Sequence, residues 1–325
     1  MPCTTRYAAR RGLCGFVCVV RACMWGRVVA AADVGVFQAF EIFSRDHAVL
    51  RKIAFAYVDI NNVPKAVRFL KAVFEADNTD WHVADVLTKL HVDTDLSAAE
   101  QWAYAAFKAG SPNALFNLGR VQQLMYERQQ SGDVREGERR ISPSDVELWY
   151  RRSLEQSPKH YSTHRWLAHT LQFHVPQKNL TGAVHHYREY LKHDASDYRC
   201  NVNMGAILLD LGIDMGEAER CFRRALNAQP ASVASMANLG RIMHKRGRSQ
   251  EAADFLYASL EKYPTIVDAR PSVESSVSDK DLHNALAVVW ASVANRQRVE
   301  YHCGHGTCDV EATLRDNQPA SAQQQ

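Results

Sequence analysis

The sequence repeats itself at a fixed interval in its C-terminal half. Pro230 and Pro264 are 34 residues apart. Before each proline comes the same order of a small residue, a turn glycine, and then alternating small and large apolar residues. The copy before Pro230 has one extra residue in its turn and consists of Met204, Gly205, Leu208, Gly212, Ala218, Phe222 and Ala225. The copy before Pro264 consists of Leu239, Gly240, Met243, Gly247, Ala252, Leu256 and Leu260. Such a period predicts stacked helical hairpins, each of which buries its apolar face against the next.

This pattern resembles the tetratricopeptide repeat, in which two antiparallel helices approach through small residues while Leu and Phe fill the adjoining gap. The alanine-rich segment 98–110 is also similar to the related Sel1-like repeat. The resemblance implies an all-α fold, a right-handed superhelical solenoid of antiparallel helical hairpins with a C-terminal capping helix. It also implies a non-catalytic role in binding other proteins.

Weaker copies of the pattern extend the repeat toward the N-terminus. A charged insert near residues 130–142 predicts a long surface loop, after which Ser142 and Pro143 begin a new helix. We expect about six hairpins over residues 33–264. Residues 34–43 predict one helix of a degenerate unit. The packing positions of the three earlier copies are Leu167, Ala168, Ala183 and Tyr187 in the first, Leu118, Gly119, Trp149 and Tyr150 in the second, and Ala54, Tyr57, Ala66 and Leu70 in the third.

The two ends of the chain do not carry the repeat. Residues 1–32 contain five arginines and no acid, which predicts a basic arm or a targeting segment. After the repeats we expect a linker over 265–277, a single capping helix over 278–301 with its apolar residues on one face, and a flexible tail over 302–325.

Residues on the first helix of each hairpin are those that meet a ligand in the tetratricopeptide family. Asparagine occupies one such position in three units, and an asparagine amide can pair with a peptide group of a partner. Basic residues nearby would favour an extended acidic peptide. Trp166 interrupts the series, and the alternative that asparagine is only a common residue before Leu-Gly stays open. The candidate partner-binding residues are Asn117, Arg120, Arg165, His169, Asn203, Asn238 and Arg241.

Two other classes of function remain as alternatives. The net charge of +3 gives no general reason to expect nucleic acid as a partner, but some helical repeats bind RNA. Seven histidines between His160 and His193 could serve a metal-binding or enzymatic protein, although packed or solvated histidines explain them better. We expect no catalytic residue and no cofactor, because phosphate-binding and nucleophile motifs are absent from the sequence.

The cysteines and hydropathy bear on the compartment. Cys200 and Cys221 fall in predicted helices, where free thiols behave as small buried hydrophobes in a reducing environment. We therefore expect a cytoplasmic protein without a membrane span that works in a larger complex, with mitochondrial targeting through residues 1–32 as the alternative.

A short segment near the C-terminus contains two histidines and two cysteines, namely His302, Cys303, His305 and Cys308. A metal site, a disulfide and free thiols are all left open for these residues.

Overall fold

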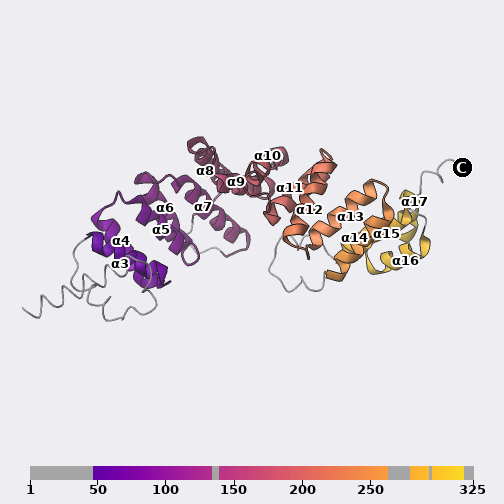
Figure 1. Ribbon diagram of the computed structural model, residues 1–325, viewed down its shortest axis with the longest axis horizontal. Coiled ribbons are helices and arrows are strands. Elements are labelled where there is room, and N and C mark those ends of the chain that lie inside the picture. The colour runs from indigo at the N-terminus through magenta and orange to yellow at the C-terminus, as the bar shows by residue number, and fades with distance from the viewer. Residues whose placement is uncertain (1–46, 134–138, 263–278, 293–294, 318–325) are drawn as a thin grey trace, which may run out of the picture. The chain divides into compact units, whose positions relative to one another are not determined.

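The computed structural model of the protein describes residues 47–133, 139–262, 279–292 and 295–317, and these residues contain fifteen helices and no strand (Figure 1). The chain divides into two compact units, Met1–Ile141 and Ser142–Gln325. The predicted all-α class is confirmed. The basic arm 1–32, the helix expected over 34–43 and the linker 265–277 lie outside the described residues. In the described ranges, every helix is too short or too polar to cross a bilayer.

The described part of the first unit consists of two hairpins and a further helix. Helix α3 packs on α4, α5 packs on α6, and α6 also contacts α7. In the first hairpin the rings of Tyr57 and Phe69 stack with their centroids 5.6 Å apart, beside the fully buried Ala54 and Ala66. Ala54, Tyr57 and Ala66 are packing residues that the sequence predicted, and the fourth, Leu70, is also fully buried. The bounds are α3 His47–Asp59, α4 Val63–Ala76, α5 Trp81–His91, α6 Leu96–Lys108 and α7 Ala114–Gln130.

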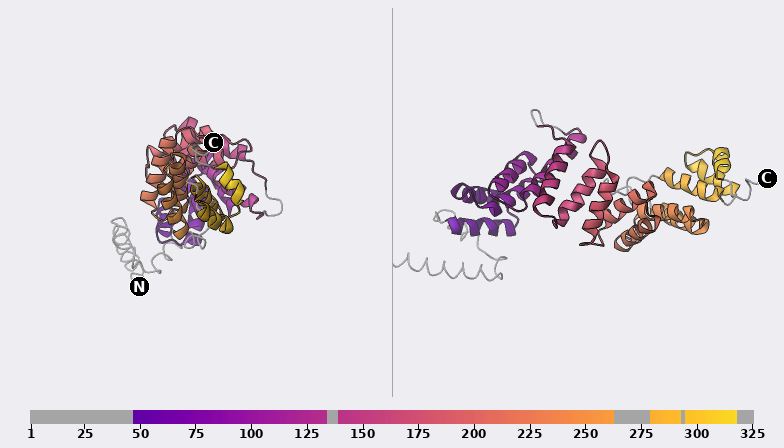
Figure 2. Two further views of the ribbon diagram at one scale, coloured as in Figure 1. Left: turned by 90° about the vertical axis from the view of Figure 1, so that its right-hand side faces the viewer. Right: turned by 90° about the horizontal axis from the view of Figure 1, so that it is seen from above.

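The second unit contains four consecutive hairpins between α8 and α17. They are α9–α10, α11–α12, α13–α14 and α15–α16, and each contacts the next hairpin through α10–α11, α12–α13 and α14–α15 (Figure 2). The bounds are α8 Pro143–Gln156, α9 Tyr161–Phe173, α10 Leu180–Leu191, α11 Tyr198–Leu211, α12 Met215–Ala228, α13 Val233–Lys245, α14 Ser249–Lys262, α15 Asp279–Ala291, α16 Arg296–His305 and α17 Val310–Asp316.

Glycines at two packing positions let the helices of a hairpin approach closely. A β-carbon on Gly205 would lie 2.9 Å from Cζ of Phe222, and one on Gly240 would lie 2.8 Å from Cγ of Leu256. Non-bonded carbons do not approach to these distances, so a larger residue at either site would force its neighbours to shift. The predicted packing of small against large residues is thereby confirmed. The turn glycine Gly212 has a φ of 65°, in the left-handed region that glycine tolerates best.

The insert after α7 begins and ends beside that helix. Gln129 donates from Nε2 to the carbonyl oxygen of Arg139, at 2.8 Å, and its Oε1 accepts from the amide of Ile141, at 3.1 Å. Ser142 then caps α8 in a reciprocal capping box with Asp145, as the sequence indicated. Helices α7 and α8 belong to different units, so the hairpin expected between them stays a prediction, as does the handedness of a superhelix over the whole chain.

The C-terminal region differs from its prediction. A single helix over 278–301 and a flexible tail over 302–325 were expected, but the chain forms α15 and α16 as a hairpin, followed by α17. Asn295 caps the new helix by accepting from the amide of Arg298. Val299, His302 and Cys303 are buried, and Cys303 forms a disulfide with Cys308. The apolar pattern of the sequence ended before α16 because, beside Val299, that helix buries a histidine and a cysteine.

Candidate protein-binding surface

Five of the seven candidate residues fall on the first helices of hairpins and two fall on α7, and the seven do not form one described site. Asn117 and Arg120 lie on α7 in the first unit. The other five lie on α9, α11 and α13 in the second unit. Each unit therefore presents its own candidate residues, and we consider them separately.

Asn117 joins two helices of the first unit. Its Nδ2 donates to Oδ1 of Asp85 on α5, at 3.0 Å, while the hydroxyl of Ser111 donates to Oδ2 of the same carboxylate, at 2.7 Å. Asp85 is only 4% exposed, so these two donors compensate for the removal of its charge from water. Asn117 thus holds α7 against α5. Arg120 lies one turn further along α7 and is partly buried.

Arg165 makes the corresponding link between α9 and α11 in the second unit. Its Nη1 lies 3.2 Å from Oδ2 of Asp197, the residue that caps α11 by accepting from the amide of Cys200. The guanidinium also lies over the ring of Tyr190, 5.7 Å from the centroid. Burial alone would lower the pKa of Arg165, but Asp197, together with Cys200 and Tyr190, raises the pKa overall. Arg165 therefore stays charged and bound to the neighbouring hairpin.

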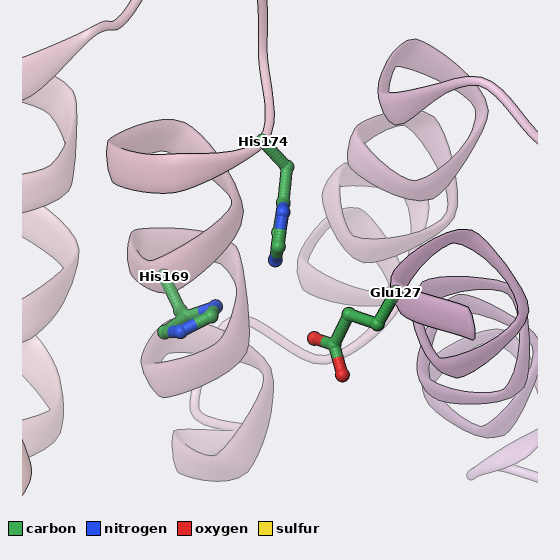
Figure 3. A group of neighbouring side chains, drawn as sticks. All are labelled: Glu127, His169 and His174. Atoms are coloured by element: carbon green, nitrogen blue, oxygen red, sulfur yellow. The ribbon is translucent and has the colours of Figure 1, made fainter. Parts of the chain in front are cut away.

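His169 belongs to an aromatic cluster at the end of α9. Its ring centroid lies 4.8 Å from that of Phe173 and 5.1 Å from that of His174, which directly follows the helix (Figure 3). Glu127, also drawn in Figure 3, belongs to the first unit, where its carboxylate accepts from Nε2 of Gln123 at 2.8 Å. The surroundings of His169 within its own unit are thus mainly aromatic.

Asn203 lies inside the hairpin stack. It is 5% exposed, and its Nδ2 donates to the hydroxyl of Tyr187 at 3.0 Å. That hydroxyl in turn donates to Oε1 of Gln172 at 2.8 Å, so the chain of hydrogen bonds connects α11, α10 and α9. Burial raises the pKa of Tyr187, which keeps its hydroxyl protonated as a donor. A ligand could reach little of the Asn203 amide.

Asn238 and Arg241 form a small cluster on α13 with Asp210 of α11. The amide of Asn238 donates to the carbonyl oxygen of Ala234 and accepts from Nη1 of Arg241, both at 2.9 Å. Arg241 Nη2 donates to Oδ1 of Asp210 at 3.2 Å. The side chains of Arg241 and Asp210 are 47% and 59% exposed, so this pair faces solvent.

Three candidates therefore bind an acidic residue that lies about one repeat away in the sequence. The pairs are Asn117 with Asp85, Arg165 with Asp197, and Arg241 with Asp210. Sequence reasoning identified the basic or amide member of each pair and missed its acidic partner. The signal was present, because each acid lies 31 or 32 residues from its partner, close to the repeat length.

The histidines for which a metal-binding role was left open, and the two thiols that were expected to be buried, are packed into the hairpins. His164 Nε2 donates to the carbonyl oxygen of Pro158 at 3.1 Å, so its Nδ1 is left as the acceptor for Nδ1 of His186, at 2.9 Å. Burial, with the nearby His164, lowers the pKa of His186 to about 4. Burial raises the pKa of the Cys200 thiol and raises that of Cys221 to about 11. These groups stabilise the fold in neutral form.

The described parts of both units contain antiparallel helical hairpins. No family model matches the sequence, and no curated protein matches it. Among solved structures, the chain is similar to YrrB, described as a TPR protein with an unusual peptide-binding site, with 16% identity and a TM-score of 0.45 over 63% of this chain and 97% of that one. It is also similar to MamA from Desulfovibrio magneticus RS-1, with 12% identity and a TM-score of 0.45 over 58% of this chain and 97% of that one. Likeness at this level assigns no partner.

Proposed function

We propose that the chain is a non-catalytic adaptor that docks other proteins on its helical hairpins within a larger assembly. The observation that carries this proposal is the contact between the first helices α11 and α13, with Arg241 and Asp210 exposed where the two helices meet. Recurring helices of this kind offer a surface to a partner without requiring a pocket. The cytoplasmic location remains a prediction.

The chemistry of the described residues agrees with a binding role. The thiols of Cys200 and Cys221 are buried, and burial raises the pKa of each, so neither supplies the thiolate that nucleophilic catalysis needs. His164 and His186 hydrogen-bond each other across α9 and α10. Both pairs of residues serve packing between helices.

Arg241 is the residue on which we place the contact with a partner. A surface ion pair contributes only about 0–1 kcal/mol, so a carboxylate of the partner can replace Asp210 at little cost. Guanidinium also binds carboxylate through two parallel hydrogen bonds. Arg165 is less suited, because its partner Asp197 is 11% exposed and also caps α11. The ligand class that fits Arg241 is an extended acidic peptide segment.

A ladder of asparagines contributes less to this proposal than the sequence suggested. The amides of Asn117, Asn203 and Asn238 each donate to an acceptor of the chain itself. A peptide would have to compete with these bonds, and Asn203 is nearly inaccessible. The proposed contact therefore depends on charge at Arg241 and not on a row of amides.

Selection from a displayed library of extended peptides with varied charge tests the proposal. We expect the full chain to select acidic peptides, and we expect Arg241→Gln to weaken their binding roughly tenfold, the effect of losing one charged hydrogen-bonded pair. Asp210→Asn should strengthen binding, because it removes the internal competitor for Arg241.

Arg223→Gln is the matched control. Arg223 is 53% exposed on α12 and pairs with Glu219 of its own helix, so its loss should leave peptide binding unchanged. Selection of no peptide by the wild-type chain, or equal losses in the two arginine variants, would contradict the proposed contact.

A further inference from the structure

Three histidines from two helices gather in the C-terminal hairpin. His283 lies on α15, and His302 and His305 lie on α16. The ring centroid of His283 is 5.2 Å from that of His302 and 5.2 Å from that of His305. Residues three apart on a helix face the same side, so both histidines of α16 are directed toward α15.

Two ring nitrogens of this cluster converge. Nδ1 of His283 and Nδ1 of His302 lie 2.9 Å apart. Imidazole nitrogens bind zinc at about 2.0–2.1 Å, and two such ligands of a tetrahedral ion lie roughly 3.3 Å apart. The pair needs to open by only a few tenths of an ångström to hold one ion between its two nitrogens.

The outer nitrogen of His302 is fixed by a residue of another hairpin. Its Nε2 lies 2.9 Å from the hydroxyl of Tyr257 on α14, and His302 itself is 1% exposed. Histidines that bind metals are typically oriented in this way, with one nitrogen toward the ion and the other hydrogen-bonded to a neighbouring group. Tyr257 therefore aims Nδ1 of His302 at His283.

His305 supplies the third nitrogen. Its Nδ1 donates to the carbonyl oxygen of Tyr301 at 2.8 Å, so its Nε2 is the atom with a lone pair. The side chain is exposed, so on binding an ion it can exchange its hydrogen bond to Tyr301 for a rotamer that directs Nε2 toward the other two histidines. Three histidines with a solvent-facing fourth position form a common zinc arrangement.

We propose that His283, His302 and His305 bind one zinc ion, with water as the fourth ligand. The ion joins α15 to α16 and, through Tyr257, fixes the terminal hairpin on α14. The nearby cysteines do not belong to this site, because Cys303 and Cys308 are bonded to each other and Sγ of Cys303 lies 3.9 Å from Oγ1 of Thr313. Imidazole nitrogens alone are the protein ligands.

Zinc titration of the full chain, freed of metal with a chelator and carrying no histidine tag, tests the site. We expect one zinc ion per chain and an X-ray absorption spectrum with nitrogen and oxygen but no sulfur ligands. His305→Gln, at an exposed position that should not affect folding, is expected to weaken binding at least tenfold. Tyr257→Phe should weaken it roughly tenfold, the usual effect of losing an outer partner.

Two control variants separate this site from its rivals. The double variant His164→Gln with His186→Gln removes the other histidine pair with the same 2.9 Å spacing, and it should still bind zinc. The double variant Cys303→Ser with Cys308→Ser should bind it as well. Failure of the wild type to bind zinc, unchanged affinity in both His305→Gln and Tyr257→Phe, or loss of zinc in the cysteine variant would overturn the proposal.

Discussion

The ring of Phe222 lies against the backbone of Gly205, so close that a β-carbon there would be 2.9 Å from the ring's Cζ. Leu256 stands in the same relation to Gly240 in the next hairpin. The two hairpins thus reproduce one packing solution, in which the large residue of the second helix fills the space that the glycine of the first helix leaves open.

Replacement of these glycines by alanine should destabilise the second unit. The added methyl group would have to displace a fully buried ring or leucine, which typically costs about 1–3 kcal/mol. Urea unfolding of Gly205→Ala and Gly240→Ala should show lower midpoints than the wild type. Gly304→Ala is the matched control, because open space surrounds a β-carbon there and alanine favours a helix. Equal stability of Gly205→Ala and wild type would contradict the packing described.

The hydroxyl of Tyr187 should contribute measurably to stability. Tyr187→Phe removes the acceptor of Asn203 and the donor to Gln172, which leaves buried polar groups without these partners. We expect a loss of about 1–3 kcal/mol, measured by urea unfolding. Tyr301→Phe alters an exposed residue and should change the free energy of unfolding by less than about 0.5 kcal/mol. Equal effects of the two substitutions would argue against the hydrogen-bonded chain.

Stability should fall between pH 6.5 and about 4 because of His186. Its pKa is lowered by burial, then by His164, His185 and Arg151, while Glu189 opposes these effects. The unfolded chain binds a proton near pH 6.5 and the folded chain only near pH 4, so the free energy of unfolding decreases as the pH falls through this interval. We expect a loss on the order of 2 kcal/mol for this partly exposed group.

Urea unfolding at several pH values measures this dependence. His186→Gln should reduce it, because the variant cannot take up that proton, while His302, whose pKa burial also lowers to about 4, still contributes. An unchanged slope between pH 4 and 6.5 in that variant would assign the acid sensitivity to other groups.

The buried thiols should resist alkylation in the folded chain. The pKa of Cys221 is raised from 9.0 to about 11, mainly by burial, which reduces its thiolate fraction about 100-fold at neutral pH. Iodoacetamide labelling followed by peptide mass spectrometry should show Cys200 and Cys221 modified in urea and protected in buffer. Rapid modification of either residue in the folded chain would contradict its burial.

The sequence predicted most reliably those packing positions at which two side chains or a glycine and a side chain meet within one hairpin. Gly205 and Gly240 could be identified from spacing alone, because the small residue and its large neighbour recur at fixed positions. The partners of Arg165 and Arg241 were missed although each lies about one repeat away, because the contact joins two adjacent hairpins and depends on how those hairpins pack. The candidate residues were thus placed on the correct helices, but their hydrogen bonds were missed.

Helix α16 shows why the C-terminal region was harder to predict. Hydrophobic periodicity identifies a helix by its apolar face, but α16 buries His302 and Cys303 among its few inward residues. Burying a histidine costs little free energy once both of its ring nitrogens have hydrogen-bond partners. The ring nitrogens of His302 have such partners in Tyr257 and His283. Composition gives no sign of such partners in advance.

The hydrogen bonds of Gln129 have a practical consequence for labelling the protein. Because one side chain binds both the carbonyl oxygen of Arg139 and the amide of Ile141, the segment between Asp133 and Arg139 starts and finishes at the end of α7. An epitope or a fluorescent domain placed within that segment would be attached through two neighbouring points. The two hydrogen bonds of Gln129 would remain, which makes this segment the natural insertion point for an internal tag.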